Sequence, residues 1–437
     1  DKELPSMKRR AVIGLIVAFT IVGVFLVPNY FYLVSFPDSI GLPVGQSQSF
    51  SFNIHLPVKA RLLTGPRVKL NETWLTEKPT EIHLGHPLTL KTAEIGQSEV
   101  ELLLFGFPCR RILVEAKERD IVVPGGHAVG VLLASRGIIV VGYDNTITTD
   151  GSYHPAQDAG ILPGDLLLEA NGSPLLKVAD LIQAVKNAGS RQTTLVLKLQ
   201  RGMGVRTVEL DPVRTRQGPY RIGLYVRDGA NGVGTLSFYD PSRGCFGALG
   251  HVVSDSDTGT PLVIRSGSIV KALISNVNIG VRGQPGEKIG VFQPGEGYLG
   301  RIVANTEFGI FGVLHEPLEN PYHREGIPVA LASEVYSGPA TMYTVLERDE
   351  IEGFQVEIER IIGYNPTDKG LVLKITDERL LERAGGIIQG MSGSPIIQDN
   401  RLVGIVTHVF VNDPSRGFGI LAEWMLEKSK CISKGAA

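Results

Sequence analysis

The sequence predicts a mainly β protein of two or three domains that ends in a pair of packed β-barrels. With 437 residues, the chain is too long for a single hydrophobic core. Short runs rich in Val and Ile recur at regular spacing, and 52 Gly and 26 Pro residues separate them. In the C-terminal half, only Ala422–Lys428 has a convincing helical pattern. Regular strand spacing over this length is typical of barrels.

The N-terminus predicts a membrane anchor within residues 1–36. Three basic residues, Lys8 to Arg10, precede the apolar run Ala11–Val27, and the aromatic run Tyr30–Tyr32 follows it. The apolar run is at the short end of a spanning helix. The basic cluster should stay in the cytoplasm, which places the bulk of the chain outside. A cleaved signal peptide is the alternative, but no small-residue cleavage site follows Val27.

Residues 37–117 predict a β-rich spacer domain without a chemical motif. The alternating runs Ser49–Leu56 and Glu99–Phe105 are typical of strands. The net charge of −2 gives no electrostatic case for binding nucleic acid. The three cysteines form no C-x-x-C pair, so we expect no metal site, and no motif requires a cofactor.

Residues 118–214 carry a different set of signals. The glycine-containing turn Ala159–Asp165 leads into the strand Leu166–Glu169, and a tight turn at Asn171-Gly172 follows. Val178–Ala188 has a helical apolar stripe, and two strands close the unit. This arrangement resembles a PDZ domain.

The PDZ resemblance implies that this domain binds a peptide or a C-terminus. In PDZ domains a glycine-containing loop presents backbone N–H groups to the peptide carboxylate, and the peptide adds as a strand to the sheet edge. The segment Gly125–Val131 is the candidate loop, and the groove either recruits a substrate or acts in cis. The predicted peptide-binding residues are Gly125, Gly126, Val129, Gly130 and Val131.

The strongest chemical motif is Gly390–Pro395, read G-M-S-G-S-P, in residues 215–437, which we expect to form a serine peptidase domain. A serine between glycines in a tight loop lets the backbone approach a substrate carbonyl. By analogy with trypsin-like enzymes, Ser392 is the nucleophile. The amides of Gly390 and Ser392 would then form the oxyanion hole.

A serine hydroxyl needs a base, and His251 is the candidate among the nine histidines. It lies in Gly247–Val253, between an apolar strand-like stretch and a turn rich in Ser and Asp. In two-barrel serine proteases the first barrel supplies the base and the second supplies the serine. The separation of His251 from Ser392 fits that division.

Spacing alone does not identify the acid that should orient the imidazole. Asp377 precedes the serine by fifteen residues, and Asp255 and Asp257 closely follow the histidine. Glu296 and Glu307 lie midway between histidine and serine.

The strand after the serine usually forms a wall of the pocket for the substrate side chain. Thr407 and His408 fall near that point. A histidine there predicts a preference for an acidic or polar residue before the cut.

The C-terminal half resembles the sporulation serine peptidases typified by stage IV sporulation protein B. The motifs that carry this resemblance are G-H-V-V-S-D at His251, I-T-D at Asp377, G-I-I-Q-G-M-S-G-S-P at Ser392, and the run Gly404–Pro414. The order of anchor, PDZ domain and peptidase also matches. The resemblance implies that His251 is the base, Asp377 the acid and Ser392 the nucleophile. In a trypsin-like fold, an acid just before the serine would have to reach the base by an unusual route.

The resemblance also implies a biological setting. Members cleave themselves and leave the membrane. They signal from the forespore across the intermembrane space by cutting a regulatory membrane protein, which licenses a late sigma factor.

Two other readings remain. One is a non-catalytic PDZ adaptor with a degenerate protease scaffold, which the intact His251 and Gly390–Pro395 motifs oppose. The other is a Ser–Lys peptidase, which the lack of a Ser-x-x-Lys motif around Ser392 opposes.

Overall fold

A computed structural model describes residues 38–45, 47–50, 57–82, 88–292, 297–362 and 366–435, together with Ile13, Gly14 and Val17. It divides the chain into two compact units. One comprises the residues up to Asp120 and residues 331–334, and the other comprises residues 121–330 and 335–437. The predicted anchor Ala11–Val27 lies outside the described residues apart from those three positions. No helix among the described residues is long and apolar enough to cross a membrane.

The N-terminal unit contains two β-sheets. One has the strand order β1-β9-β8-β3-β6, and the other has the order β2-β7-β4-β5. Alternating residues of both sheets form a common hydrophobic core that includes Leu42, Val58 and Val114. Its elements are β1 Ser39–Pro43, β2 Ser47–Phe50, β3 Val58–Thr64, β4 Val68–Leu70, β5 Thr73–Trp74, β6 Thr80–Ile82, β7 Leu88–Thr92, β8 Gly96–Leu104, β9 Phe107–Lys117 and the short helix η1 Ala332–Glu334.

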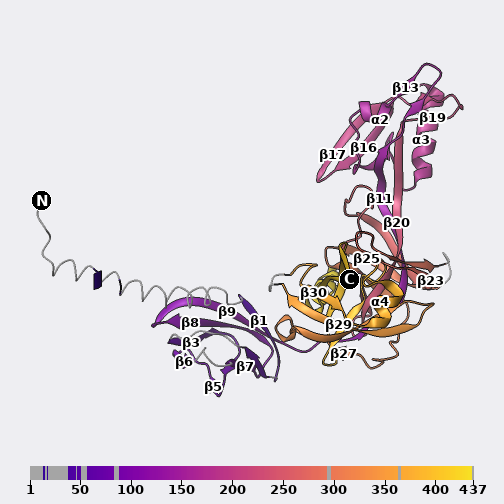
Figure 1. The fold of residues 1–437 in the computed structure, drawn as a ribbon. Coiled ribbons are helices and arrows are strands. Elements are labelled where there is room, and N and C mark those ends of the chain that lie inside the picture. The colour runs from indigo at the N-terminus through magenta and orange to yellow at the C-terminus, as the bar shows by residue number, and fades with distance from the viewer. Residues whose placement is uncertain are drawn as a thin grey trace, which may run out of the picture. The chain divides into compact units, whose positions relative to one another are not determined.

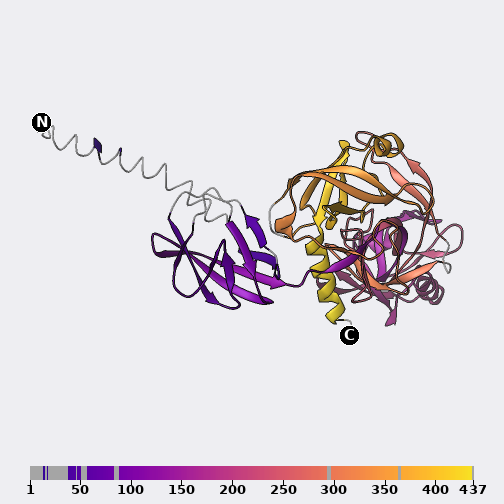
Figure 2. The same cartoon turned by 90° about the horizontal axis from the view of Figure 1, so that it is seen from below.

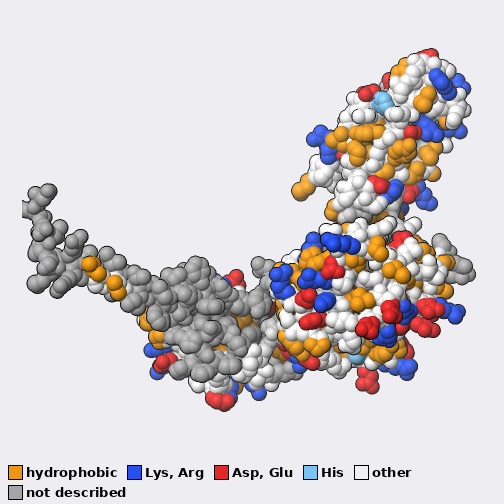
Figure 3. Space-filling view, viewed as in Figure 1, with side chains coloured by type: hydrophobic (Ala, Val, Ile, Leu, Met, Phe, Trp, Pro, Cys, Tyr) orange, Lys and Arg blue, Asp and Glu red, His pale blue; other side chains and the backbone are white. Residues whose placement is uncertain are grey.

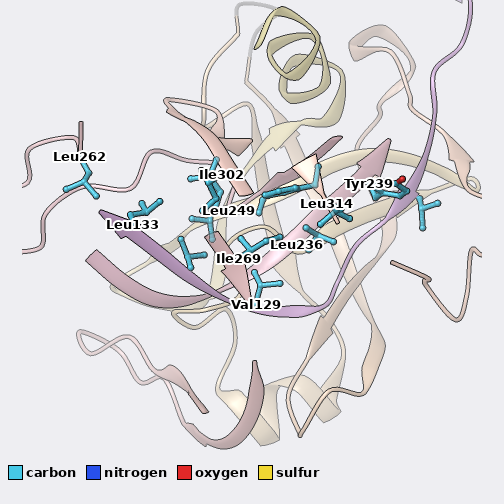
Figure 4. Close-up of a cluster of buried hydrophobic side chains, with 14 of the residues drawn as sticks. Val129, Leu133, Leu236, Tyr239, Leu249, Leu262, Ile269, Ile302 and Leu314 are labelled. Atoms are coloured by element: carbon cyan, nitrogen blue, oxygen red, sulfur yellow. The ribbon is translucent and has the colours of Figure 1, made fainter. Parts of the chain in front are cut away.

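The second unit begins with a ring of six paired strands, which we call the first barrel. Its order is β11-β22-β25-β26-β21-β20, and the pairing of β11 with β20 closes the ring. Figure 4 shows apolar side chains from several of these strands, among them Val129, Leu236 and Ile269, converging in its core. The strands are β10 Ile121–Pro124, β11 Ala128–Tyr143, β20 Leu224–Asp240, β21 Cys245–Ala248, β22 Ile264–Lys271, β25 Tyr298–Thr306, β26 Gly309–Leu314 and β27 Ile327–Pro328, of which β10 and β27 extend the sheet beyond the ring.

The PDZ elements are inserted into the first barrel through two long strands. Residues 128–134 of β11 pair with β22 and β20 in the barrel, whereas Ile138 and Ile139 pair with β14 beyond a register shift. Figure 1 shows β11 and β20 running from the barrel to helices α2 and α3. The inserted elements are β12 Thr146–Ile147, β13 Ser152–Tyr153, α2 Pro155–Asp158, β14 Leu166–Ala170, β15 Ser173–Pro174, α3 Val178–Arg191, β16 Leu195–Arg201, β17 Gly204–Leu210, β18 Val213–Arg214 and β19 Tyr220–Arg221.

This insertion corrects the predicted boundaries of 118–214 for the PDZ domain and 215–437 for the peptidase. The strands before Ser135 belong to the barrel, and the start of β20 still belongs to the PDZ unit. A continuous strand has the same alternating pattern in both domains, so its sequence contains no boundary signal.

A hairpin between β22 and β25 of the first barrel contacts the second barrel. It consists of β23 Leu273–Asn278 and β24 Glu287–Val291, and we call residues 273–291 the clamp hairpin. Its main chain bonds to the second barrel at both ends, through Ile274 with Arg348 and through Lys288 with Gln389.

The second barrel is closed, with the strand order β28-β29-β30-β33-β32-β31. Helix α5 ends the chain and contacts strands of both barrels, namely β21 and β26 of the first and β32 and β33 of the second. It is the yellow helix in Figure 2, and it extends the predicted helix Ala422–Lys428 to Gly435. The elements are β28 Gly338–Val345, β29 Ile351–Ile361, β30 Leu371–Ile375, α4 Glu378–Ala384, β31 Pro395–Gln398, β32 Arg401–Phe410, β33 Asp413–Leu421 and α5 Ala422–Gly435.

Candidate active site

The candidate nucleophile lies in the loop between α4 and β31, which we call the nucleophile loop (residues 386–394). Gly390 has φ +91° and Gly393 has φ +100°, a region that favours glycine. A Cβ atom on Gly393 would overlap the carbonyl oxygen of Thr235 and come within 2.7 Å of the nitrogen of Leu249. The loop of the second barrel is therefore pressed against β20 of the first, and only glycine fits at this contact.

Thr235 holds the nucleophile loop from the first barrel. Its hydroxyl donates to the carbonyl of Gly390 at 2.7 Å, and its N–H donates to the carbonyl of Ser392 at 3.0 Å. Among the residues that the structure describes, the N–H groups of Gly390 and Ser392 have no acceptor. These two amides, predicted as the oxyanion hole, are thus left available to a ligand.

His251 follows β21 at a tight turn in which Leu249 and Gly250 have φ of +70° and +73°. Its Nδ1 atom lies 2.8 Å from the carbonyl oxygen of Val252. Because a carbonyl can only accept, Nδ1 carries the proton, and the lone pair of the neutral ring is on Nε2. Burial lowers the pKa of His251, opposed by the Val252 carbonyl and the charge of Asp368, so the ring is neutral at pH 7. This is the protonation state that a general base needs.

The structure brings His251 and Ser392 to the same cavity. This cavity has a volume of about 540 Å³ and is also lined by Gly390, by Gln389 and by residues of β20. The Ser392 hydroxyl donates to the carbonyl of Thr407 at 2.7 Å. Rotation about χ1 of Ser392 would release this bond and redirect the hydroxyl.

The structure corrects the prediction that Asp377 orients His251. The Asp377 carboxylate caps the N-terminus of α4 and accepts from the Arg379 side chain at 2.8 and 3.0 Å. It also accepts from the N–H of Gln355. Hydrogen bonds from Arg379 are the main cause that lowers its pKa. A carboxylate bonded in this way is a helix cap and ion-pair partner, and it makes no contact with the imidazole.

The alternative acids also have other partners. Asp255 accepts from the N–H groups of Asp257 and Thr258, and Asp257 pairs with Arg227. Glu307 pairs with Lys428, and Glu296 lies outside the described residues.

Asp368 is the carboxylate whose charge acts on the histidines of the site. It raises the pKa of both His251 and His408 against the effect of burial. Its Oδ2 atom lies 4.0 Å from Nδ1 of His408, and the ring centroids of His408 and His251 are 4.9 Å apart. Asp368 therefore supplies negative charge to the site through space, whereas the Val252 carbonyl fixes the tautomer.

We predict that Asp377→Asn will change kcat by less than tenfold. Asparagine caps helices about as well as aspartate, so the loss is mainly that of a half-exposed ion pair, about 1 kcal/mol of unfolding free energy. The lowered pKa means that this stability is present above the unfolded pKa of Asp377 and is lost as the pH falls through the folded one. Kinetics and thermal unfolding of the variant measure both quantities. A fall in kcat of about 10⁴-fold would restore Asp377 as the acid of a triad.

The two predicted pocket residues differ in position. The Thr407 side chain is buried and donates to the Asp368 carbonyl at 2.8 Å, so its contact with the nucleophile is through its own carbonyl. His408 is half-exposed beside His251, and burial together with that neighbour lowers its pKa to about 4. His408 is thus uncharged at pH 7, and a preference for an acidic substrate residue would have to come from hydrogen bonding.

The predicted PDZ loop lies elsewhere in the structure, which is a second correction. Gly125 and Gly126 donate to the carbonyls of Ser237 and Leu236, and residues 129–131 pair with both β20 and β22 inside the first barrel. Their N–H groups are therefore committed to the sheet. Gly223, with φ +76°, precedes the part of β20 that lies in the PDZ unit.

Three residues that shape the site were not predicted from the sequence. Thr235 and Asp368 lie in ordinary strand and turn contexts, which contain no signal of a role. Lys288 does have a weak signal, because it is a lone lysine in the short strand run Glu287–Val291.

Comparisons with known proteins agree with this geometry. Residues 218–426 match the family described as SpoIVB peptidase S55, and residues 154–199 match the PDZ domain. The protein is thus a serine peptidase that carries a PDZ domain. The peptidase part, residues 218–426, is similar to the SpoIVB peptidase family S55.

Solved structures and curated proteins were also compared. The chain is similar to the Rv3671c protease in its inactive form, with 15% identity and a TM-score of 0.28 over 46% of this chain and 84% of that chain. For the active form, from M. tuberculosis, the identity is 14% and the TM-score 0.27 over 46% and 74%. No curated protein matches the chain significantly.

Proposed function

We propose that this chain is a membrane-tethered serine endopeptidase of the trypsin-like, two-barrel type. Ser392 is the nucleophile, His251 is the general base, and the amides of Gly390 and Ser392 bind the oxyanion. The supporting observation is that a serine, a neutral histidine and two unbonded amides line one cavity where the two barrels meet.

The reaction begins when the Ser392 hydroxyl turns from the Thr407 carbonyl toward Nε2 of His251. His251 takes the proton as the oxygen attacks the substrate carbonyl, and the resulting oxyanion is bound by the two amides. The imidazolium then protonates the leaving amine, and water hydrolyses the acyl-enzyme by the same steps.

The imidazolium needs stabilisation while it carries the proton. The Val252 carbonyl accepts from Nδ1, and Asp368 supplies negative charge from beyond His408. In this mechanism a main-chain carbonyl and a distant carboxylate share the task of the acid in a Ser-His-Asp triad.

We place the PDZ ligand along the first residues of β20. Residues 224–227 pair with β11 on one side, and helix α3 contacts this part of the unit through Val178, whose N–H donates to Asp228 at 2.9 Å. A peptide or C-terminus would add there as a further strand, with its carboxylate at the Gly223 loop. Figure 3 shows hydrophobic side chains gathered on one face of this unit, which suits a peptide partner.

The cellular role that we propose rests on the apolar N-terminal run and on the name of the matched family. The chain is anchored by residues 11–27 with its bulk outside the cytoplasm, and it is released after self-cleavage. Its substrate is the extracytoplasmic part of a regulatory membrane protein in sporulation signalling between compartments, at the forespore membrane.

The test compares the full-length wild type with Ser392→Ala in detergent. We expect the wild type to react with a fluorophosphonate and to shorten itself, and Ser392→Ala to do neither, because both reactions need the activated serine hydroxyl that the variant lacks. Gel fluorescence and mass spectrometry of the fragments measure both events.

Ser337→Ala is the matched control. This serine is in the same barrel and its hydroxyl donates only to the Glu359 carbonyl, so labelling should equal that of the wild type. Equal labelling of Ser392→Ala and the wild type would refute Ser392 as the nucleophile. Absence of labelling in both would favour the non-catalytic adaptor.

A further inference from the structure

We infer that Lys288 is a positioning residue, which holds the oxyanion-binding part of the nucleophile loop in place from the clamp hairpin of the other barrel. This inference rests on the proposed role of Ser392 and goes beyond it, because Lys288 contacts neither the substrate cavity nor the reacting atoms.

The clamp hairpin bonds to the segment that leads into the nucleophile. Gly280 donates to the carbonyl of Ala384 at the end of α4, and Gly283 donates to Val411. Gln389 donates to Gly286 at 2.8 Å, and its carbonyl accepts from the N–H of Lys288 at 2.9 Å. Gln389 immediately precedes Gly390, so these two bonds fix the position of the Gly390 amide, the first donor of the proposed oxyanion hole.

The Lys288 side chain continues this contact beneath the loop. It is only 5% exposed, and a Cβ atom on Gly390 would come within 3.1 to 3.3 Å of its Cβ, Cδ and Cγ atoms. The aliphatic part of Lys288 thus packs on the Cα side of Gly390, while Thr235 holds the carbonyl of the same glycine. Movement of the lysine would displace the amide that binds the oxyanion.

The amine ends in a small buried hydroxyl network. Its Nζ atom lies 2.7 Å from the hydroxyl of Thr344, and the Ser394 hydroxyl lies 3.0 Å from the same oxygen. Thr344 and Ser394 are both fully buried. Ser394 is two residues after the nucleophile. Lys288 therefore contacts the loop before Ser392 directly, at Gly390, and after Ser392 through the Thr344 hydroxyl.

Among the residues that the structure describes, no charged side chain is paired with the Lys288 amine. Burial alone lowers the pKa of Lys288 to about 7, and no charged group of β23, β28, β29, α4 or the nucleophile loop contributes. Glu287 is exposed and accepts from Asn278, Arg383 pairs with Glu352, and Asp377 pairs with Arg379. Lys288 therefore changes charge near neutral pH.

The two charge states favour different arrangements of the loop. A neutral amine accepts from the Thr344 hydroxyl and can remain buried. An ammonium must donate, and it leaves an uncompensated charge in an apolar site, which favours movement of the hairpin toward water. The nucleophile loop is therefore in place above pH 7 and loosens below it. This effect on activity adds to that of His251 protonation.

The test is the pH profile of kcat/KM and of fluorophosphonate labelling on full-length chains. The wild type should lose activity with a midpoint near 7 as the pH falls. Lys288→Met keeps the bulk without the charge, so its midpoint should move below 6.5, toward the lowered pKa of His251. Lys288→Arg keeps its charge at every pH. We therefore expect its labelling to be slower than that of the wild type by about 10-fold or more, even at high pH.

Two further variants keep the outcome decisive. Thr344→Val retains the lysine but removes the ammonium's acceptor, so it should shift the midpoint in the same direction as Lys288→Met. Lys374→Met, at an exposed lysine of β30, should match the wild type. Wild-type midpoints in both Lys288→Met and Thr344→Val would overturn the inference. Labelling of Ser392→Ala tests only the nucleophile role of Ser392, whereas the pH midpoints test only the positioning role of Lys288.

Discussion

Replacing His251 with alanine is expected to lower kcat by about 10⁴-fold or more, with KM changed by less than about tenfold. The imidazole lines the same cavity as Ser392 and carries its proton on Nδ1, so in the proposed mechanism its task is proton transfer. Its loss therefore removes an interaction made in the transition state and leaves ground-state binding intact. Steady-state kinetics on a cleavable peptide measure the two constants separately.

His315→Ala is the control for this variant. His315 is exposed in the first barrel beyond β26, and its substitution should leave both constants at the wild-type level. A His251→Ala enzyme that kept more than about a tenth of the wild-type kcat would show that another base serves Ser392.

Replacing Gly393 with alanine is expected to abolish labelling and to reduce the free energy of unfolding by about 3 kcal/mol or more. The new methyl group would overlap the Thr235 carbonyl, so the nucleophile loop and β20 would have to separate. The bond from Thr235 to Ser392 would be lost with that movement. Chemical denaturation and the rate of fluorophosphonate reaction measure the two effects.

Gly218→Ala is the matched control for strain without a clash. Gly218 has φ +106°, close to that of Gly393, but a Cβ atom there would have no neighbour within 4 Å. We expect a loss of only about 1 kcal/mol and unchanged labelling. Similar losses in both variants would show that backbone strain, and not the contact between the barrels, makes Gly393 necessary.

Local motifs were the part of the site that the sequence predicted well. The G-M-S-G-S-P motif spans six positions, and His251 has its own glycine-containing turn, so both were recognisable without the fold. The mainly β class and the PDZ helix followed from residue periodicity. The resemblance to the sporulation serine peptidases is confirmed by the family match over residues 218–426.

The remainder depends on contacts between segments that are distant in the sequence. Asp377 has the spacing expected of a triad acid, yet a local arginine and a helix N-terminus use its carboxylate. Gly125–Val131 has the composition of a ligand loop, but it leads into β11 and bonds to barrel segments more than a hundred residues away, which the local sequence does not reveal. Thr235 and Lys288 gain their importance only when two barrels meet.

Because the PDZ unit is inserted into the first barrel, the continuous strand β20 lies in both. Its first residues border the groove where a peptide would add, and Thr235, eleven positions later, carries both bonds to the nucleophile loop. That distance is about 35 Å of extended chain. No loop interrupts β20 between these two points, so a change of twist at the proposed peptide groove would reach the bonds that hold the proposed nucleophile.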